Sequence, residues 1–328
     1  MDIGKVSETV LKRSILKQIK HRREEVLVGP GVGEDCSVIE LGNDEVFVIS
    51  TDPITGTTEN IGTLAVHITA NDISSNGAEI VGIMLTILLP VGSKETELKD
   101  IMKEIETVCA KLNIEIMGGH TEITAAANQP IITVTGVGKM PKEYMIKTAG
   151  VLPGQEIIMT KWAGLEGTAI IAKRKETELL SKYTKDFIGG AKNFIENISV
   201  VEEAKIARKM GVTSMHDVTE GGLYGALWEL AEASGVGIEV DIKKIPIRQE
   251  TVEICEFYDL NPYQLISSGV MLMVTDKANA LVDELKKKGI SAAVIGRITE
   301  GNDRVIMNGE EKRFLEPPKS DELYKVSN

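Results

Sequence analysis

The stretch from Val46 to Ala78 constrains the fold most strongly, because it joins a predicted buried strand to a predicted helix through acidic residues. Residues 46–49 are β-branched or aromatic, so they predict a buried strand that delivers Asp52 to its end. From residue 61 onward, apolar side chains recur at helical spacing, and the same face continues to Asp72. A carboxylate on the core side of a helix is costly unless it is paired or binds a cation. The alternative is that Asp72 caps a neighbouring segment.

Similar acidic residues recur elsewhere in the chain, which favours a functional interpretation. Asp35 follows Gly33 in a glycine-rich loop, and Asp217 follows a short predicted strand. We expect each of these residues to lie at a turn between elements, where binding sites are commonly built. For Asp217, an ordinary N-terminal cap on the next helix is the alternative.

A second polar stretch, residues 118–122, follows the strand predicted at 114–117. After the paired glycines, His120 and Glu122 either belong to a turn with solvent-facing side chains or present an edge for hydrogen bonding and metal binding. Together with the acidic residues, the second interpretation is favoured.

Composition excludes several classes of protein. The 328 residues are enough for two domains, and the net charge of -12 argues against a nucleic-acid binder that relies on attraction to phosphate. Magnesium could still join carboxylates to a nucleotide. The three cysteines predict neither a disulfide framework nor a zinc site. With no long apolar run, no membrane span is expected, and the protein is predicted to be cytoplasmic.

The chain is predicted to divide into four parts. A helical arm covers 1–28, with a helix at 6–20 whose basic residues form either a solvated face, which we favour, or a source of cations for an anionic ligand. Two domains follow at 29–145 and 150–315, then a polar tail at 316–328, whose last four residues, 325–328, are expected to be loose. Ser93 is expected to cap a helix that reaches about Leu112, and a further helix is expected to begin near Ala169.

The ordered motifs resemble one known superfamily, which contains aminoimidazole ribonucleotide (AIR) synthetase, thiamine-monophosphate kinase, selenophosphate synthetase and the hydrogenase-maturation protein HypE. The segments that carry this resemblance span most of the chain; they are 33–35, 50–52, 71–73 with 77–78, 118–121, 153–154 and 216–223. Residues 216–223, His-Asp-Val-Thr-Glu-Gly-Gly-Leu, and 234–238 resemble HypE in particular.

The resemblance implies an α+β protein with a two-domain AIR-synthetase-like fold. Its N-terminal sheet-and-helix domains would form a β-barrel in a homodimer, and its C-terminal domain would be an α/β sandwich. It implies ATP and Mg²⁺ as cofactors, with magnesium bound by Asp35, Asp52, Asp72 and Asp217. The implied nucleotide-binding residues are Gly33, Asp35, Thr51, Asp52, Asn71, Gly118, Gly119 and Thr121, and the implied catalytic residues are Asp72, His120 and Asp217.

The implied function is Mg-dependent and uses ATP to phosphorylate, and in some relatives to dehydrate, a carbonyl, amide or phosphate acceptor. The acceptor would be a small molecule or a group carried by a partner protein. HypE acts on a cysteine at its own carboxyl terminus, whereas this sequence ends in Asn328 and its last cysteine is Cys255. The alternatives are a nucleotide-binding scaffold or sensor without turnover, and a small-molecule kinase of the thiamine-monophosphate or selenophosphate synthetase type.

Overall fold

The computed structural model describes residues 8–10, 12, 16, 24–34, 36–42, 44–55, 57–317 and 320–326. The predicted ligand Asp35 and most of the predicted helix at 6–20 lie outside the described residues. The chain forms two compact units, which we describe separately. The first-sheet unit comprises 23–29 and 35–145, and the second-sheet unit comprises 1–22, 30–34 and 146–328. The predicted two-domain α+β class is confirmed, and each unit contains one mixed sheet.

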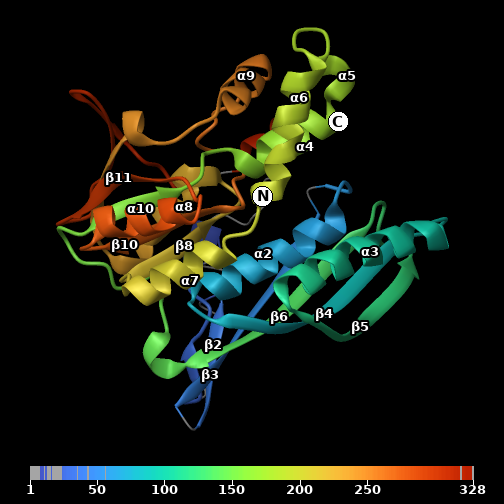
Figure 1. Ribbon diagram of the computed structural model, residues 1–328, viewed down its shortest axis with the longest axis horizontal. Helices are drawn as coiled ribbons and strands as arrows, with labels where there is room; N and C mark the ends of the chain where they lie inside the picture. The colour runs from blue at the N-terminus through green and yellow to red at the C-terminus, as the bar shows by residue number, and fades with distance from the viewer. Residues whose placement is uncertain are drawn as a thin grey trace. The chain divides into compact units, whose positions relative to one another are not determined.

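A six-stranded sheet in the order β1-β2-β3-β6-β4-β5 forms the first-sheet unit (Figure 1). Its strands are β1 (Val26–Val28), β2 (Ser37–Gly42), β3 (Glu45–Ile54), β4 (Glu79–Pro90), β5 (Glu115–Thr124) and β6 (Ile131–Pro141). β4 and β5 are parallel, and the other pairs are antiparallel. Residues 26–28, which we expected in a helical arm, therefore form a strand.

Two helices, α2 (Ile61–Ser75) and α3 (Glu95–Leu112), lie side by side against this sheet (Figure 1). Helix α2 is buried along nearly its whole length. The predicted cap Ser93 was wrong, because α3 begins after Lys94, whose backbone N–H donates to Oε2 of Glu97 at 3.2 Å. The N–H of the residue that precedes the helix is thus hydrogen-bonded by a side chain of the first helical turn.

Strand β5 continues through the paired glycines, with a shift in its register against β4 just before Gly118, so residues 118–122 form a strand and not a turn. Gly119 permits this course, because a side chain there would place its Cβ 2.0 Å from the carbonyl oxygen of Leu85. The glycine therefore allows β5 to pair closely with β4.

A seven-stranded sheet in the order β13-β12-β9-β11-β7-β10-β8 forms the second-sheet unit. Its strands are β7 (Glu156–Thr160), β8 (Ser214–Val218), β9 (Gly237–Asp241), β10 (Val270–Thr275), β11 (Ala292–Thr299), β12 (Arg304–Asn308) and β13 (Glu311–Phe314). β10 is buried at every position, which agrees with its unbroken apolar sequence. Neither sheet closes into a barrel within the described residues.

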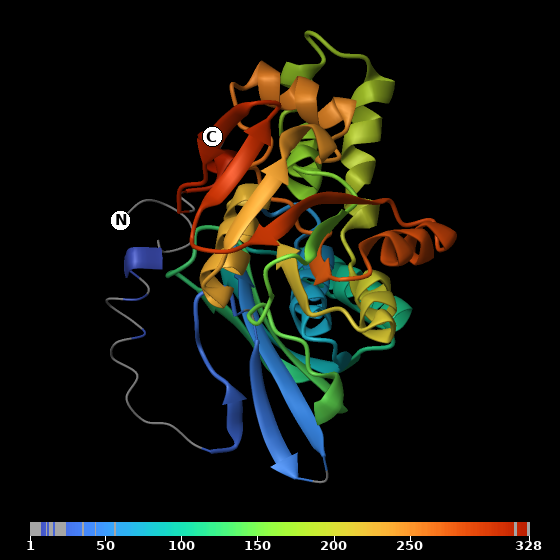
Figure 2. The same ribbon diagram turned by 90° about the vertical axis from the view of Figure 1, so that its left-hand side faces the viewer.

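The helices of this unit fall into separate groups (Figure 2). Helices α7 (Val201–Met210) and α10 (Ala278–Lys287) cover one face of the sheet and share a core with Ile158, Met215 and Met271. Helix α8 (Gly222–Ser234) packs against β8. A second core joins α4 (Leu165–Arg174), α5 (Glu176–Leu179), α6 (Lys185–Lys192) and α9 (Gln249–Phe257).

Helix α4 begins at Leu165, four residues before the expected start near Ala169. Gly164 precedes it in a left-handed conformation, and the Ser267 hydroxyl accepts the Gly164 N–H at 2.7 Å. Gly167 packs tightly on Leu265, where a Cβ would lie 2.4 Å from Cγ. Residues that resemble a glycine-rich loop thus form the first helical turn.

Within the predicted polar tail, the expected loose end was wrong for Lys325 and Val326, because residues 320–326 are ordered. These residues include the short 3₁₀ helix η6 (Glu322–Lys325), and Asp321, Glu322 and Leu323 are buried. None of the helices in the described part of the chain is long and apolar enough to cross a membrane.

Candidate functional site

Two of the predicted acidic residues meet at one serine in the first-sheet unit. The Ser50 hydroxyl donates to Oδ2 of Asp72 at 2.5 Å and lies 3.5 Å from Oδ2 of Asp52. Ser50 and Asp52 are two residues apart on β3, so they face the same side of the sheet. Asp72 comes from α2, and only 3% of it is exposed. The structure therefore joins two carboxylates from different elements through a shared hydroxyl.

The main chain at Asp72 is held from three directions. Its carbonyl oxygen accepts the Ser75 hydroxyl at 2.6 Å, the Cys36 thiol at 3.2 Å and the Asn76 amide at 3.5 Å. The bonds from Ser75 and Asn76 lie within the last turn and the cap of α2, and the thiol bond joins α2 to the residue that precedes β2. Asp72 lies inside a helix on its core side, as predicted. Asp52 lies within β3, so our expectation that it lies at a turn was wrong.

Oxygen ligands of this kind suit Mg²⁺. Within the described ranges, no group of three or more His, Cys, Asp or Glu side chains is placed to hold a metal ion. Magnesium in nucleotide sites usually needs only one or two carboxylates, with phosphate and water oxygens completing its shell. Asp52 and Asp72 supply that number, and the burial of Asp72 favours a compensating cation.

Two other predicted nucleotide-binding residues, Asn71 and Thr51, differ in their position relative to this pair. Asn71 is fully buried beside Asp72 on α2. Thr51 alternates with Ser50 and so faces the opposite side of β3, where its hydroxyl is 2.9 Å from that of Thr135 on β6.

The predicted catalytic His120 is not brought to this pair within the unit. It lies on edge strand β5, separated from β3 by β6 and β4, which is a distance of about 14 Å at the usual strand spacing. Its Nε2 is 3.4 Å from Oε2 of Glu122, and both side chains are more than half exposed. Gly118, Gly119 and Thr121 lie on the same exposed strand.

The second-sheet unit holds the other predicted motif. His216 and Asp217 lie in β8, where all five residues are buried. Nε2 of His216 is 3.1 Å from Oε2 of Glu229 on α8. Asp217 is 2% exposed, and the cap of α8 is Gly221, so Asp217 does not cap this helix.

Gly33 belongs to the same unit and approaches α8 closely. It has a φ of 71°, and a Cβ at this position would lie 3.1 Å from the carbonyl oxygen of Glu229. A glycine is therefore required here both for the backbone conformation and for the contact. The loop at 30–34 thus lies against the helix that also supplies the partner of His216.

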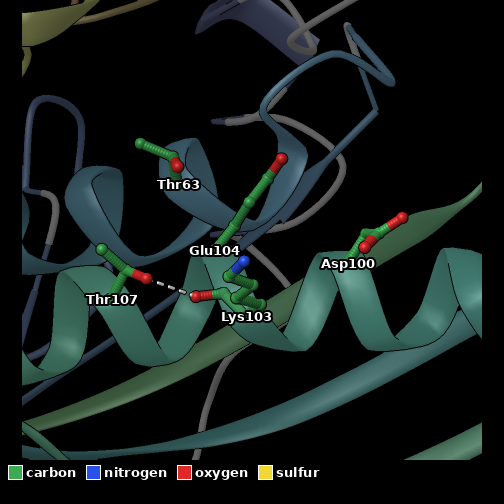
Figure 3. Close-up of a pocket in the computed structure, with 5 residues that line it drawn as sticks. All are labelled: Thr63, Asp100, Lys103, Glu104 and Thr107. Atoms are coloured by element: carbon green, nitrogen blue, oxygen red, sulfur yellow. Dashed lines mark hydrogen bonds between the residues drawn. The ribbon is translucent and has the colours of Figure 1, made fainter.

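A shallow groove between α2 and α3 is a poor alternative site (Figure 3). It is lined by Thr63, Asp100, Lys103, Glu104 and Thr107. Oε2 of Glu104 accepts the Gly62 N–H at 3.0 Å, so a carboxylate already occupies the start of α2. An anionic ligand would meet two carboxylates and a single lysine here.

Sequence reasoning missed two site residues. Ser50 was available as part of the Ser-Thr-Asp motif, and strand alternation would have placed it beside Asp52. Glu229 gave a weaker signal, namely one carboxylate in the otherwise apolar run 226–231.

Comparison with family models shows which family the chain belongs to. The models described as "AIR synthase related protein, N-terminal domain" and "AIR synthase related protein, C-terminal domain" match residues 33–140 and 153–308. The chain belongs to the AIR synthase related family, which confirms the resemblance.

Individual relatives add detail. The chain is 30% identical to a putative hydrogenase expression/formation protein of Methanocaldococcus jannaschii, over 98% of this chain and 97% of that protein. The structure of a HypE–HypF complex contains a chain that is similar to this protein, with a TM-score of 0.78 and 20% sequence identity. The match covers 94% of this chain and 99% of that chain. A structure of HypE in complex with ATP matches this protein with a TM-score of 0.73 and 20% sequence identity, over 99% of this chain and 98% of that chain.

Proposed function

We propose that this protein binds ATP with Mg²⁺ and transfers a phosphoryl group to a carbonyl, amide or phosphate oxygen. The observation that carries the proposal is the Ser50 hydroxyl between Asp52 and the buried Asp72. Family membership and the similarity to an ATP-bound HypE structure support the choice of ATP.

Each residue of the site would have its own role in binding magnesium and the nucleotide. Asp52 and Asp72 would bind magnesium, and Ser50 would hold the Asp72 carboxylate in one orientation by donating to Oδ2. The Cys36 thiol, which donates to the Asp72 carbonyl from outside the helix, would help to keep α2 from shifting when charge accumulates nearby. The bound Mg²⁺ would neutralise phosphate charge, which is the main requirement of phosphoryl transfer.

The acceptor is proposed to be a group other than the chain's own thiols. Cys36, Cys109 and Cys255 are all buried. Burial raises the pKa of Cys109 to about 11 and that of Cys255 to about 12, so neither thiol readily forms a nucleophilic thiolate. A carbonyl or amide on a small molecule or partner protein fits these facts better. Asp35, Asp217 and His120 are proposed as further contributors to the ATP and magnesium site.

A homodimer is proposed from the six-stranded sheet. Phe47, Val81 and Met84 are 36%, 41% and 50% exposed. Phe47 lies on β3 and the other two residues lie on β4. Exposed apolar residues on a sheet often mark an interface. A second copy of this chain is the proposed occupant. Light scattering should give twice the chain mass, and Met84→Lys should shift the protein toward monomer; a monomeric native protein would refute the dimer.

Calorimetric titration with ATP tests the proposed function. The native protein should bind ATP in the presence of Mg²⁺ and weakly without it, and Asp72→Asn should abolish the magnesium dependence. Asp100→Asn on α3 is the matched control, because it removes an exposed carboxylate from the same unit. Binding that is equal in all three proteins would refute the metal assignment. Binding without ADP formation across acceptor screens would favour a nucleotide sensor.

A further inference from the structure

Residues 320–326, termed here the C-terminal segment, are bound to the rest of the second-sheet unit by buried acidic side chains. Asp321 is 2% exposed and Glu322 is 6% exposed. Carboxylates are rarely this buried unless hydrogen bonds compensate them. The partners of these two residues therefore show what the segment holds in place.

Asp321 makes more bonds than a helix cap needs. Oδ1 accepts the N–H of Leu323 at 2.8 Å, which caps η6, and also the N–H of Ile266 at 3.2 Å. Oδ2 accepts the N–H of Gly221 at 2.7 Å. The bonds to Ile266 and Gly221 join segments about 55 and 100 residues away in the sequence. Capping alone does not explain them.

The neighbouring residue binds the same region. Oε2 of Glu322 accepts the N–H of Asn261 at 3.0 Å. The C-terminal segment thus holds the loop 261–266 at both ends and holds the turn 219–222 through Gly221. Tyr324 lies beside the same turn: burial raises its pKa to about 12, and the charge of Glu220 adds to this effect.

The turn 219–222 has little freedom of its own. Gly221 and Gly222 have φ values of 88° and 62°, and the Gly222 N–H donates to the Thr219 carbonyl at 3.1 Å. A Cβ on Gly222 would lie 2.7 Å from the carbonyl oxygens of Tyr263 and Leu265. The turn is therefore fitted against the loop that the C-terminal segment also binds.

This turn joins the two elements that carry the buried polar motif. It directly follows β8, which contains His216 and Asp217, and it begins α8, which contains Glu229. A shift of the turn would move α8 relative to β8 and alter the 3.1 Å contact between His216 and Glu229.

We propose that Asp321 is a positioning residue for ATP chemistry, because its hydrogen bonds hold the turn that connects β8, which contains Asp217, to α8. This inference rests on the proposed function, in which Asp217 takes part. Asp321 acts through Gly221 and is not assigned a contact with the nucleotide.

Asp321→Asn tests the proposal with little change in volume. One carboxylate oxygen becomes an NH₂ donor, so either the Gly221 bond or the two bonds at the other oxygen must be lost. Asp241→Asn is the matched control, since Asp241 also caps a 3₁₀ helix, through the Lys243 N–H at 3.0 Å. Asp321→Ser is a second variant, in which a shorter side chain keeps the cap of η6 but does not reach Gly221.

The full chain is titrated with Mg-ATP at a temperature where circular dichroism shows every variant folded. Hydrogen exchange is followed at residues 219–223. We expect Asp321→Asn to weaken Mg-ATP binding by about tenfold or more and to speed this exchange, while Asp241→Asn changes neither. If Asp321→Asn does not fold, Asp321→Ser is expected to give the same loss of affinity.

Unchanged or tighter binding by the folded Asp321 variants would overturn the positioning role while leaving the proposed function intact. An equal loss of affinity in Asp241→Asn would also overturn it, because replacing any capping carboxylate by an amide would then suffice. Failure of the native protein to bind Mg-ATP would overturn the proposed function itself, and with it this inference. That result is distinguishable because it appears before any substitution is made.

Discussion

The Ser50 hydroxyl donates to Oδ2 of Asp72 at 2.5 Å and thereby joins strand β3 to helix α2. Both residues are at least 95% buried. A hydrogen bond from a neutral donor to a buried charge contributes more to stability than one between neutral groups. Here the bond also orients a carboxylate that we propose as a magnesium ligand.

Ser50→Ala should destabilise the protein and weaken Mg-ATP binding together. The carboxylate would lose a buried donor, at a cost of about 1–3 kcal/mol in the free energy of unfolding. It would also lose the contact that fixes its orientation toward Asp52. Urea denaturation measures the first effect, and calorimetric titration with Mg-ATP measures the second.

Ser75→Ala is the control for this prediction. Ser75 is equally buried, but its hydroxyl bonds the main-chain carbonyl of Asp72 at 2.6 Å and not the carboxylate. It should lower stability with a much smaller effect on magnesium dependence. If both variants changed ATP binding equally, the special role of the Ser50 hydroxyl would be refuted.

The elements β3 and α2 were predictable separately, because a strand pattern leads to Asp52 and a helical apolar face reaches Asp72. The apolar strand at 46–49 and the helical face beginning at Ile61 correspond to β3 and α2, and the core-side position of Asp72 is confirmed. These predictions succeeded because burial of an apolar face dominates the choice of local structure.

Glycine-rich segments were harder to interpret. Gly119 lies within a strand and Gly167 within a helix, since each glycine lets a neighbour pack where a Cβ would collide. Both collisions involve residues far away in the sequence or on another strand, so a local pattern does not reveal them. The burial of Asp321 was missed for the same reason, because its partners Gly221 and Ile266 are distant in the chain.

The buried pair of His216 and Glu229 should show strong coupling. Replacing either residue with leucine would remove one partner from a site where both side chains are at most 5% exposed. Each single variant should lose about 3–5 kcal/mol of unfolding free energy, and the double variant should lose less than the sum. Additive losses in denaturant titrations would show that the 3.1 Å contact contributes no coupling.

The two glycines that bound α8 should respond differently to alanine. Gly222 and Gly235 have φ values of 62° and 64°, so alanine is strained to a similar degree at both, by about 1–2 kcal/mol. Nothing lies within 4 Å of a Cβ at Gly235, whereas Gly222 has carbonyl oxygens at 2.7 Å. Gly222→Ala should therefore lower the unfolding free energy by roughly 1–3 kcal/mol more than Gly235→Ala. Equal losses in thermal or urea unfolding would contradict the close packing of the turn.

Glu166, in the first turn of α4, makes the stability of the protein depend on pH. Burial raises the pKa of Glu166 from 4.5 to about 7, and the charges of Asp321 and Glu220 act in the same direction. A hydrogen bond from Ser268 opposes this rise. Burial likewise raises the pKa of Asp321 to about 7, although three backbone N–H groups stabilise its charged form.

Between about pH 4.5 and 7 the folded protein therefore binds more protons than the unfolded chain, so the unfolding free energy should fall as pH rises through this window. Each unit of pKa shift corresponds to about 1.4 kcal/mol. Glu166→Gln should remove its share of this slope and leave the share of Asp321, which the variant retains. Urea titrations at pH 5 and pH 8 measure the change. Glu176→Gln is the control, because Glu176 is an exposed residue of α5 and should leave the slope intact. A native protein that becomes more stable across this window would contradict the protonated, buried state of Glu166.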